Sequence, residues 1–217
     1  MNRTWIGMIA AAAFGLSSCG WMMGDKVVTA AQLVQGAREV SQRLQAAQKV
    51  STDTAETVQD AYQDLGKYLQ DKNMTDARLQ RMEATMARLK EKSERLKKSL
   101  NGTEDSAKDL FRLMETRAKQ NQTESLRDRL LKDIRAKKKS FEQTMETAED
   151  GMDKIRASIQ KYDDILGFVQ VNRGLQGVDQ YMGEINKVIA EGEALNAEIQ
   201  KAIQAGIAIV DPKQFGS

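Results

Sequence analysis

The chain has 217 residues, of which 29% are charged and only 5% aromatic, and its formal net charge is +2. It contains one proline, one cysteine and no histidine. These counts exclude an internal disulfide, a multi-cysteine zinc site and any catalytic or metal centre that depends on imidazole. The nearly balanced charge gives no whole-chain signal for nucleic-acid binding. A low content of aromatic and turn residues favours long helices over an α/β domain.

Residues 1–18 have the composition of an export signal. Arg3 is the one charged side chain ahead of an apolar run, residues 5–16, which is too short to span a bilayer comfortably. The run ends in the sequence LSSC, residues 16–19, which resembles the lipobox of bacterial lipoproteins. An ordinary secretory signal that happens to contain a cysteine is the alternative interpretation.

The lipobox resemblance implies a lipid anchor at Cys19. It implies transfer of a diacylglyceryl group to the Cys19 sulfur, cleavage between Ser18 and Cys19, and acylation of the new amino group. Each buried methylene contributes about 0.8 kcal/mol, so three acyl chains would hold the chain firmly at a membrane. Residues 19–25 then form a lipidated tether. Because the residue after the cysteine is Gly20 and not aspartate, the resemblance implies the outer membrane, on its periplasmic side, with the inner membrane as the alternative.

Beyond the tether, apolar residues recur at alternating spacings of three and four, which is the heptad pattern of coiled coils. The pattern predicts helices over about 26–70, 75–119, 124–171 and 176–206. Thr75 is a plausible N-cap of the second helix. The dipeptide Asn101-Gly102 usually signals a turn, but the heptad phase continues beyond it, so we expect the second helix to be continuous.

Short loops make consecutive helices antiparallel neighbours. The sequence therefore predicts an all-α fold, an elongated antiparallel coiled-coil bundle of three to four long helices over residues 26–209, followed by a flexible tail, residues 210–217. A helix of about 45 residues is ~67 Å long, so the bundle is a rod. The fourth helix is shorter than the others, which leaves part of the rod with three helices.

Two groups of side chains could in principle hold a metal ion. Glu142, Glu146 and Glu149 follow one side of the third helix, although such a row is usually a solvated acidic face beside the seam. The second group consists of four methionines at seam positions, Met82, Met86, Met145 and Met152. At such positions methionine is usually a filler of the core. We therefore predict no metal, no cofactor, no small-molecule substrate and no enzymatic activity.

The charged residues are distributed unevenly along the rod. The first helix is acidic toward its end and the second, its antiparallel neighbour, is basic at its start, so these faces can neutralise each other. Residues 117–139, here called the basic tip, carry nine basic residues against three acidic ones. The candidate contacts of the basic tip with an anionic surface are Arg127, Arg129, Lys132, Arg135, Lys137, Lys138 and Lys139.

The topology predicts where the basic tip lies. If the first helix begins at the lipid anchor, the second helix returns toward the membrane and the third begins there. The basic tip would then face anionic lipid head groups or another anionic component of the envelope. A solvated end of the bundle is the alternative.

Three segments of the second half carry a family resemblance. They are LFRLMETRAKQNQTESLRDRL, FEQTMETAEDGMDKI and DDILGFVQVNRGLQGV, which begin at residues 110, 141 and 163. These segments resemble a family of small, all-helical, coiled-coil lipoproteins of Gram-negative bacteria, itself a domain of unknown function. The shared positions are Leu110, Phe111, Glu115, Leu126, Arg127, Met145, Ala148, Glu149, Met152, Asp164, Phe168 and Asn172. The resemblance implies a helical fold and localisation in the cell envelope, and it implies no activity.

The expected function is a structural or interaction role in the bacterial cell envelope. In this interpretation a membrane-anchored periplasmic lipoprotein presents the coiled-coil surfaces of a helical rod to a protein partner, and self-association into a homo-oligomer remains open. An accessory subunit of an envelope transport or assembly complex is the alternative.

Overall fold

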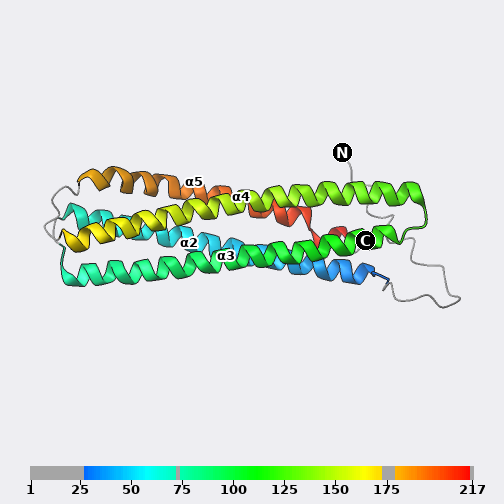
Figure 1. The fold of residues 1–217 in the computed structure, drawn as a ribbon, viewed down its shortest axis with the longest axis horizontal. Coiled ribbons are helices and arrows are strands. Elements are labelled where there is room, and N and C mark those ends of the chain that lie inside the picture. Colours follow the sequence, from blue (N-terminus) through cyan, green and yellow to red (C-terminus); the bar gives the residue numbers. More distant parts are fainter. Residues whose placement is uncertain (1–26, 72–73, 173–178, 216–217) are drawn as a thin grey trace.

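The structure is a computed structural model that describes residues 27–71, 74–172 and 179–215. Its elements are four long helices, α2 (Ala30–Gln70), α3 (Asp76–Lys119), α4 (Glu124–Val171) and α5 (Asp179–Ile209), and a short 3-10 helix, η2 (Pro212–Gln214). The long helices lie lengthwise against one another as an antiparallel rod (Figure 1). The predicted all-α, elongated bundle is confirmed. The expected signal, residues 1–18, and tether, residues 19–25, lie outside the described residues.

The helix boundaries follow from local capping chemistry. Thr29 and Gln32 form a capping box at the start of α2, in which each side chain accepts a hydrogen bond from the other residue's backbone N–H, at 3.2 and 2.8 Å. The Thr75 hydroxyl caps α3 by accepting from the backbone of Arg78 at 3.3 Å, as the sequence predicts. The α3 helix is continuous through Asn101-Gly102, which confirms the interpretation based on heptad phase.

The helices surround one apolar core. Each of α2 and α4 packs against both α3 and α5, so the four helices form a ring in cross-section. The largest aromatic contact of the core joins α2 to α4, where the Tyr62 and Tyr162 rings meet edge to face with centroids 5.7 Å apart. The Tyr62 hydroxyl also donates to the Ser158 carbonyl at 2.6 Å. These contacts fix the register of α2 against α4.

The register of α5 is set by polar contacts with α2. The Gln200 amide donates to the Thr52 hydroxyl at 2.6 Å and to the Gln48 carbonyl at 3.1 Å. One turn further along, the Gln204 amide donates to the side chain of Gln48 at 3.0 Å. The Gln200 side chain is half-buried, so a shift of α5 along the bundle would deprive its amide of these partners. Gln204 is exposed, so its amide can bond with water instead.

Close approach of α5 to α4 depends on Gly151. A Cβ atom at this position would overlap the side chain of Ile199, which is fully buried. Gly167, on the same helix, has open space where its Cβ would be. Gly151 is therefore required by packing, whereas Gly167 is not.

The helices differ in length, and this leaves one end of the rod incomplete. The α5 helix has 31 residues, against 41 in α2 and 48 in α4. Figure 1 shows that α5 stops short of the end where α3 connects to α4. At that end α2, α3 and α4 extend beyond the end of α5, as the sequence predicts.

The chain beyond α5 differs from the expected flexible tail. The α5 helix extends to Ile209, three residues beyond its predicted end, and Val210 is only 1% exposed. The Asp211 carboxylate caps η2 by accepting from the backbone of Lys213 at 3.0 Å. Through Phe215 the chain is folded back on the bundle because Val210 and Phe215 are apolar and pack against the core. The last two residues lie outside the described chain.

Alanine substitution should separate the two glycines of α4. Gly167→Ala should stabilise the protein by about 1 kcal/mol, because alanine is the better helix former. Gly151→Ala should instead destabilise it by about 1–3 kcal/mol, because the added methyl group forces α5 away from α4. Urea unfolding of both variants followed by circular dichroism measures the difference. Equal stabilisation by both substitutions would contradict the close packing of α5 on α4.

Candidate functional site

The basic tip is built around the loop between α3 and α4. Gln120 ends α3, and its backbone N–H donates to the Thr116 carbonyl at 3.2 Å. In the loop, the Asn121 carboxamide accepts from the backbone of Thr123 at 3.2 Å, and α4 begins at the next residue. This tight connection brings two basic helix ends together.

The start of the described chain lies against the same loop. The backbone N–H of Val28 donates to the side-chain oxygen of Gln120 at 3.3 Å, across 92 residues of sequence. Val28 itself is 5% exposed and belongs to the core. Figure 1 shows the start of α2 and the α3–α4 connection at one end of the rod. The chain therefore enters the bundle beside the basic tip.

The predicted contact residues of the basic tip fall into two groups. Four of them are exposed: Arg129, Lys132, Arg135 and Lys139. Three are half-buried: Arg127, Lys137 and Lys138. The exposed group faces solvent, whereas the half-buried group is partly covered by neighbouring residues.

Arg127 interacts with acidic residues of its own helix. Its guanidinium lies 3.8 Å from the carboxylates of Glu124 and Asp128. Ion pairs this long at an exposed helix end contribute little to stability. They leave the basic tip with its net positive charge, because three acidic residues cannot balance nine basic ones.

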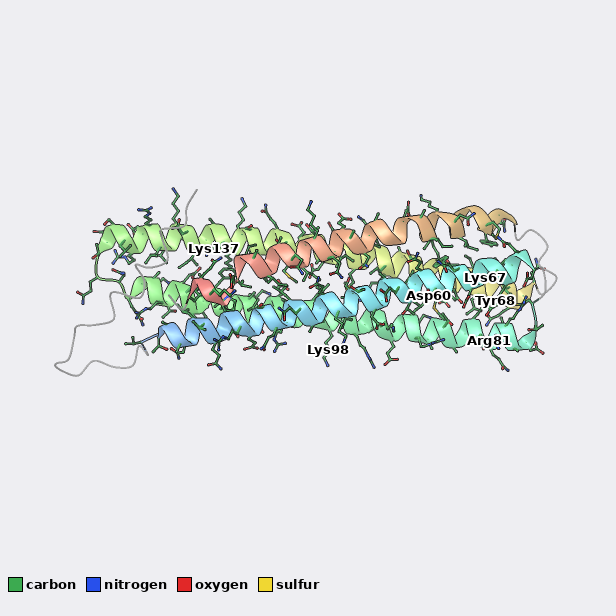
Figure 2. The ribbon with its side chains drawn as sticks, turned by 180° about the vertical axis from the view of Figure 1, so that it is seen from behind. Asp60, Lys67, Tyr68, Arg81, Lys98 and Lys137 are labelled. Carbon is green, nitrogen blue, oxygen red and sulfur yellow. The ribbon has the colours of Figure 1, made fainter. Side chains whose placement is uncertain are left out.

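Lys137 is covered by the end of the chain. Its ammonium donates to the Gln214 side chain at 2.9 Å and lies 5.8 Å from the centroid of the Phe215 ring, a cation–π distance. Burial lowers the pKa of the Lys137 amine, and the nearby Asp133 opposes this effect only in part. Figure 2 shows Lys137 toward the opposite end of the rod from Tyr68 and Arg81. Lys137 is therefore a packing residue more than a surface charge.

Lys138 lines a small niche between α3 and α4. Phe111, Phe141 and Met145 contribute apolar surface to this niche, and Glu142 is at its edge. Its volume of about 20 Å³ holds a single water molecule. The niche is too small for a substrate or a cofactor.

The acidic and the sulfur-containing candidates for a metal site lie in different environments. Glu142 and Glu146 are exposed, and burial followed by repulsion from Glu104 raises the pKa of the half-buried Glu149 carboxyl. Within residues 27–71, 74–172 and 179–215, no three His, Cys, Asp or Glu side chains are placed to hold a metal ion. The four seam methionines are buried in the core, as their spacing predicts.

In the half of the rod that leads to the α2–α3 connection, charges are paired across helices. Lys92 of α3 lies 2.6 Å from Asp53 of α2, and Arg78 lies 2.8 Å from Asp71. The guanidinium of Arg78 also lies 5.0 Å from the Tyr68 ring. These contacts confirm the predicted pairing of the acidic end of α2 with the basic start of α3.

Comparison with known proteins identifies the family. Residues 32–211 match the model of a family described as "Protein of unknown function (DUF2959)". The chain belongs to this family. No curated protein and no solved structure matches the chain significantly. Among the described helices, none is long and apolar enough to cross a membrane.

Sequence reasoning missed two features of the bundle. It missed the fold-back of the chain end over Lys137, for which the apolar residues Val210 and Phe215 around Pro212 were the available signal. It also missed the ion pairs that join α3 to α4, such as Lys90 with Asp163 at 3.0 Å. Those pairs depend on how α3 and α4 are aligned along each other, and the sequence pattern does not determine this alignment.

The exposed group should carry any contact with an anionic surface. In the unlipidated chain from Gly20 onward, a triple substitution of Lys132, Arg135 and Lys139 to Gln should weaken binding to anionic vesicles by about one to two orders of magnitude at low salt, since each charge contributes up to ~1 kcal/mol. Vesicle co-sedimentation measures this. The matched control replaces three exposed charges away from the basic tip, Arg81, Lys97 and Lys98. Equal loss in both triple variants, or equal binding to neutral vesicles, would contradict a specific role of the basic tip.

Proposed function

We propose that this chain is a membrane-anchored periplasmic lipoprotein with a structural or interaction role in the bacterial cell envelope. Acyl chains on Cys19 hold it at the outer membrane, and the four-helix rod presents its helix surfaces to other envelope components. The observation that carries the proposal is the hydrogen bond between Val28 and Gln120, which brings the entry of the chain and the basic tip to one end of the rod.

The orientation of the rod follows from this contact. Seven residues, 20–26, separate Cys19 from Val27, where the described chain begins. Even fully extended, they span only about 25 Å. The basic tip would therefore lie near the lipid surface, where anionic head groups attract Lys and Arg side chains. The other end of the rod, some 60 Å away along α2, would project into the periplasm.

The surface of the rod supports a role in contact and spacing. Its large apolar side chains are buried in the core between the helices. Its ion pairs lie mostly on the exposed faces. Such a surface is stable in water without a ligand. An elongated scaffold with an anchored end can hold a partner at a fixed distance from a membrane.

Metabolic labelling should test the anchor directly. The wild-type chain should incorporate labelled palmitate, and its mature form should begin at the modified Cys19. Cys19→Ser should abolish the label and leave the helicity unchanged, because the described helices begin only at Ala30. Gel fluorography, mass spectrometry and circular dichroism measure the three quantities.

Ser17→Thr is a suitable control, because it keeps a small polar residue near the cleavage site and leaves the thiol in place. Absence of palmitate from the wild-type chain, or a mature chain that begins at another residue, would refute the lipoprotein assignment.

A further inference from the structure

The end of the chain crosses the rod where α5 stops. Val210 is the last buried residue of the described chain, with 1% of its surface exposed. The residues that follow, 211–215, are here called the strap, and they contain η2, which lies against α2. The side chains of Gln214 and Phe215 contact Lys137 of α4, beside which Figure 2 shows the end of the chain. The strap therefore connects α2 with α4 beyond the end of α5.

The strap is held less firmly than the helices. None of its residues is fully buried, and Lys213 is exposed. Two of its hydrogen bonds are local, since the Asp211 carboxylate accepts from the backbone of Lys213 and the Gln214 amide donates to the Ala208 carbonyl at 3.3 Å. The ring of Phe215, half-buried against the core, is its apolar anchor. A segment with so little buried surface opens at a much smaller cost in free energy than the whole bundle.

The strap covers a positive charge with uncharged groups. The Lys137 ammonium donates to the amide oxygen of Gln214 at 2.9 Å and lies 5.8 Å from the centroid of the Phe215 ring. An anionic oxygen would attract this ammonium more strongly than an amide oxygen does, because it carries a full opposite charge. Burial lowers the pKa of the Lys137 amine, and Asp133, one turn earlier and exposed, opposes this effect only in part. The closed strap thus disfavours the charged form of Lys137.

We propose that the strap is a releasable cover, which an anionic lipid surface displaces from Lys137. The inference rests on the proposed contact of the basic tip with the membrane and adds a conformational step to it. A ligand shifts an equilibrium only by binding one state more tightly than the other. Lys137 can approach phosphate oxygens of a lipid surface only after Gln214 and Phe215 have left it. The open state therefore binds an anionic surface more tightly than the closed state.

Release of the strap changes the charge that the basic tip presents. Lys132, Arg135 and Lys139 of α4 are already exposed, and opening adds Lys137 to them. In water the strap stays closed because the Phe215 ring covers apolar surface of the core. At an anionic surface, attraction of the uncovered ammonium offsets the loss of this contact. The chain would then present its full positive charge only where an anionic membrane is present.

A permanent cap of the core is the competing interpretation of the strap. Such a cap explains why Phe215 packs against the core. It gives no reason for a lysine at position 137, because burying a charge beside uncharged groups costs free energy that an apolar side chain would not. The two interpretations differ in what Lys137 does once it is uncovered, and this difference can be measured.

Vesicle binding in a double-mutant cycle tests the proposal. The protein is residues 19–217 with Cys19→Ser, which contains the whole bundle and carries no lipid. Phe215→Ala should open the strap and raise the affinity for phosphatidylglycerol vesicles by about twofold to fivefold at low salt, because one charge is uncovered. In a Lys137→Gln background, the same substitution should leave the affinity unchanged. Co-sedimentation measures the affinity of all four chains, and circular dichroism checks that their helicity is equal.

The matched control replaces an aromatic residue at the other end of the rod. Phe168 is also half-buried, and its ring lies 4.8 Å from that of Tyr181. Phe168→Ala should leave vesicle binding unchanged, because it uncovers no charge of the basic tip.

Spin labels should report the opening itself. Lys213→Cys and Ser140→Cys place one label on the strap and one on α4, a turn beyond Lys137. Pulsed electron paramagnetic resonance should give one short distance in buffer and with phosphatidylcholine vesicles. With phosphatidylglycerol vesicles it should give a second, longer population. Inorganic phosphate at the same charge concentration should leave the strap closed, because free ions lack the concentrated field of a surface.

The outcomes distinguish the strap from the proposed function. An unchanged label distance on phosphatidylglycerol vesicles, or an equal effect of Phe215→Ala with and without Lys137, would overturn the strap proposal while vesicle binding by the exposed basic residues stands. Opening by phosphate alone would also overturn it, because the displacing anion would then be a free ion. Loss of all vesicle binding would refute membrane contact of the basic tip together with the strap proposal. Palmitate labelling is independent of each result, since these chains carry no lipid.

Discussion

The apolar seam that α2 shares with α3 and α5 is the constraint on which the rest of the molecule depends. It is built from residues at heptad spacing, so it fixes both the direction and the register of each neighbour. The hydrogen bond of Gln200 with Thr52 then opposes a sliding of α5 along α2, since a shift would break this contact of a half-buried amide. Because α3 runs antiparallel to α2 and is about as long, the α3–α4 loop lies beside the start of α2, where the chain enters the bundle.

The unequal helix lengths give the two ends of the rod different properties. At the end with the α2–α3 connection, four helices are present, and the ion pair between Arg78 and Asp71 joins the start of α3 to the end of α2. At the other end α5 stops short, η2 contacts α2, Phe215 packs against the core, and the basic tip carries nine basic residues against three acidic ones. We propose membrane contact at this second end, because the basic tip lies there beside the point where the chain enters the bundle.

Most of the fold was predictable because it depends on local pattern. Heptad spacing gave the four helices, Thr75 gave a cap, and the unbroken phase through Asn101-Gly102 gave the continuous α3. The position of the basic tip, at the end of the rod where the chain enters, was predictable from the order and direction of the helices. The partial burial of Lys137 was not predictable. It depends on where α5 ends and how the following residues, Gln214 and Phe215, fold over the lysine. The close contact of Gly151 with Ile199 likewise depends on the register between helices that are far apart in sequence.

The central claim is that the chain enters the bundle beside the α3–α4 loop, and pulsed electron paramagnetic resonance tests it most directly. Spin labels at Ala31→Cys and Gln122→Cys, in a Cys19→Ser background, should lie within about two helix diameters, ~25 Å. Labels at Ala31→Cys and Asp71→Cys should lie ~60 Å apart, the length of α2. A distance of ~60 Å between positions 31 and 122 would contradict the account.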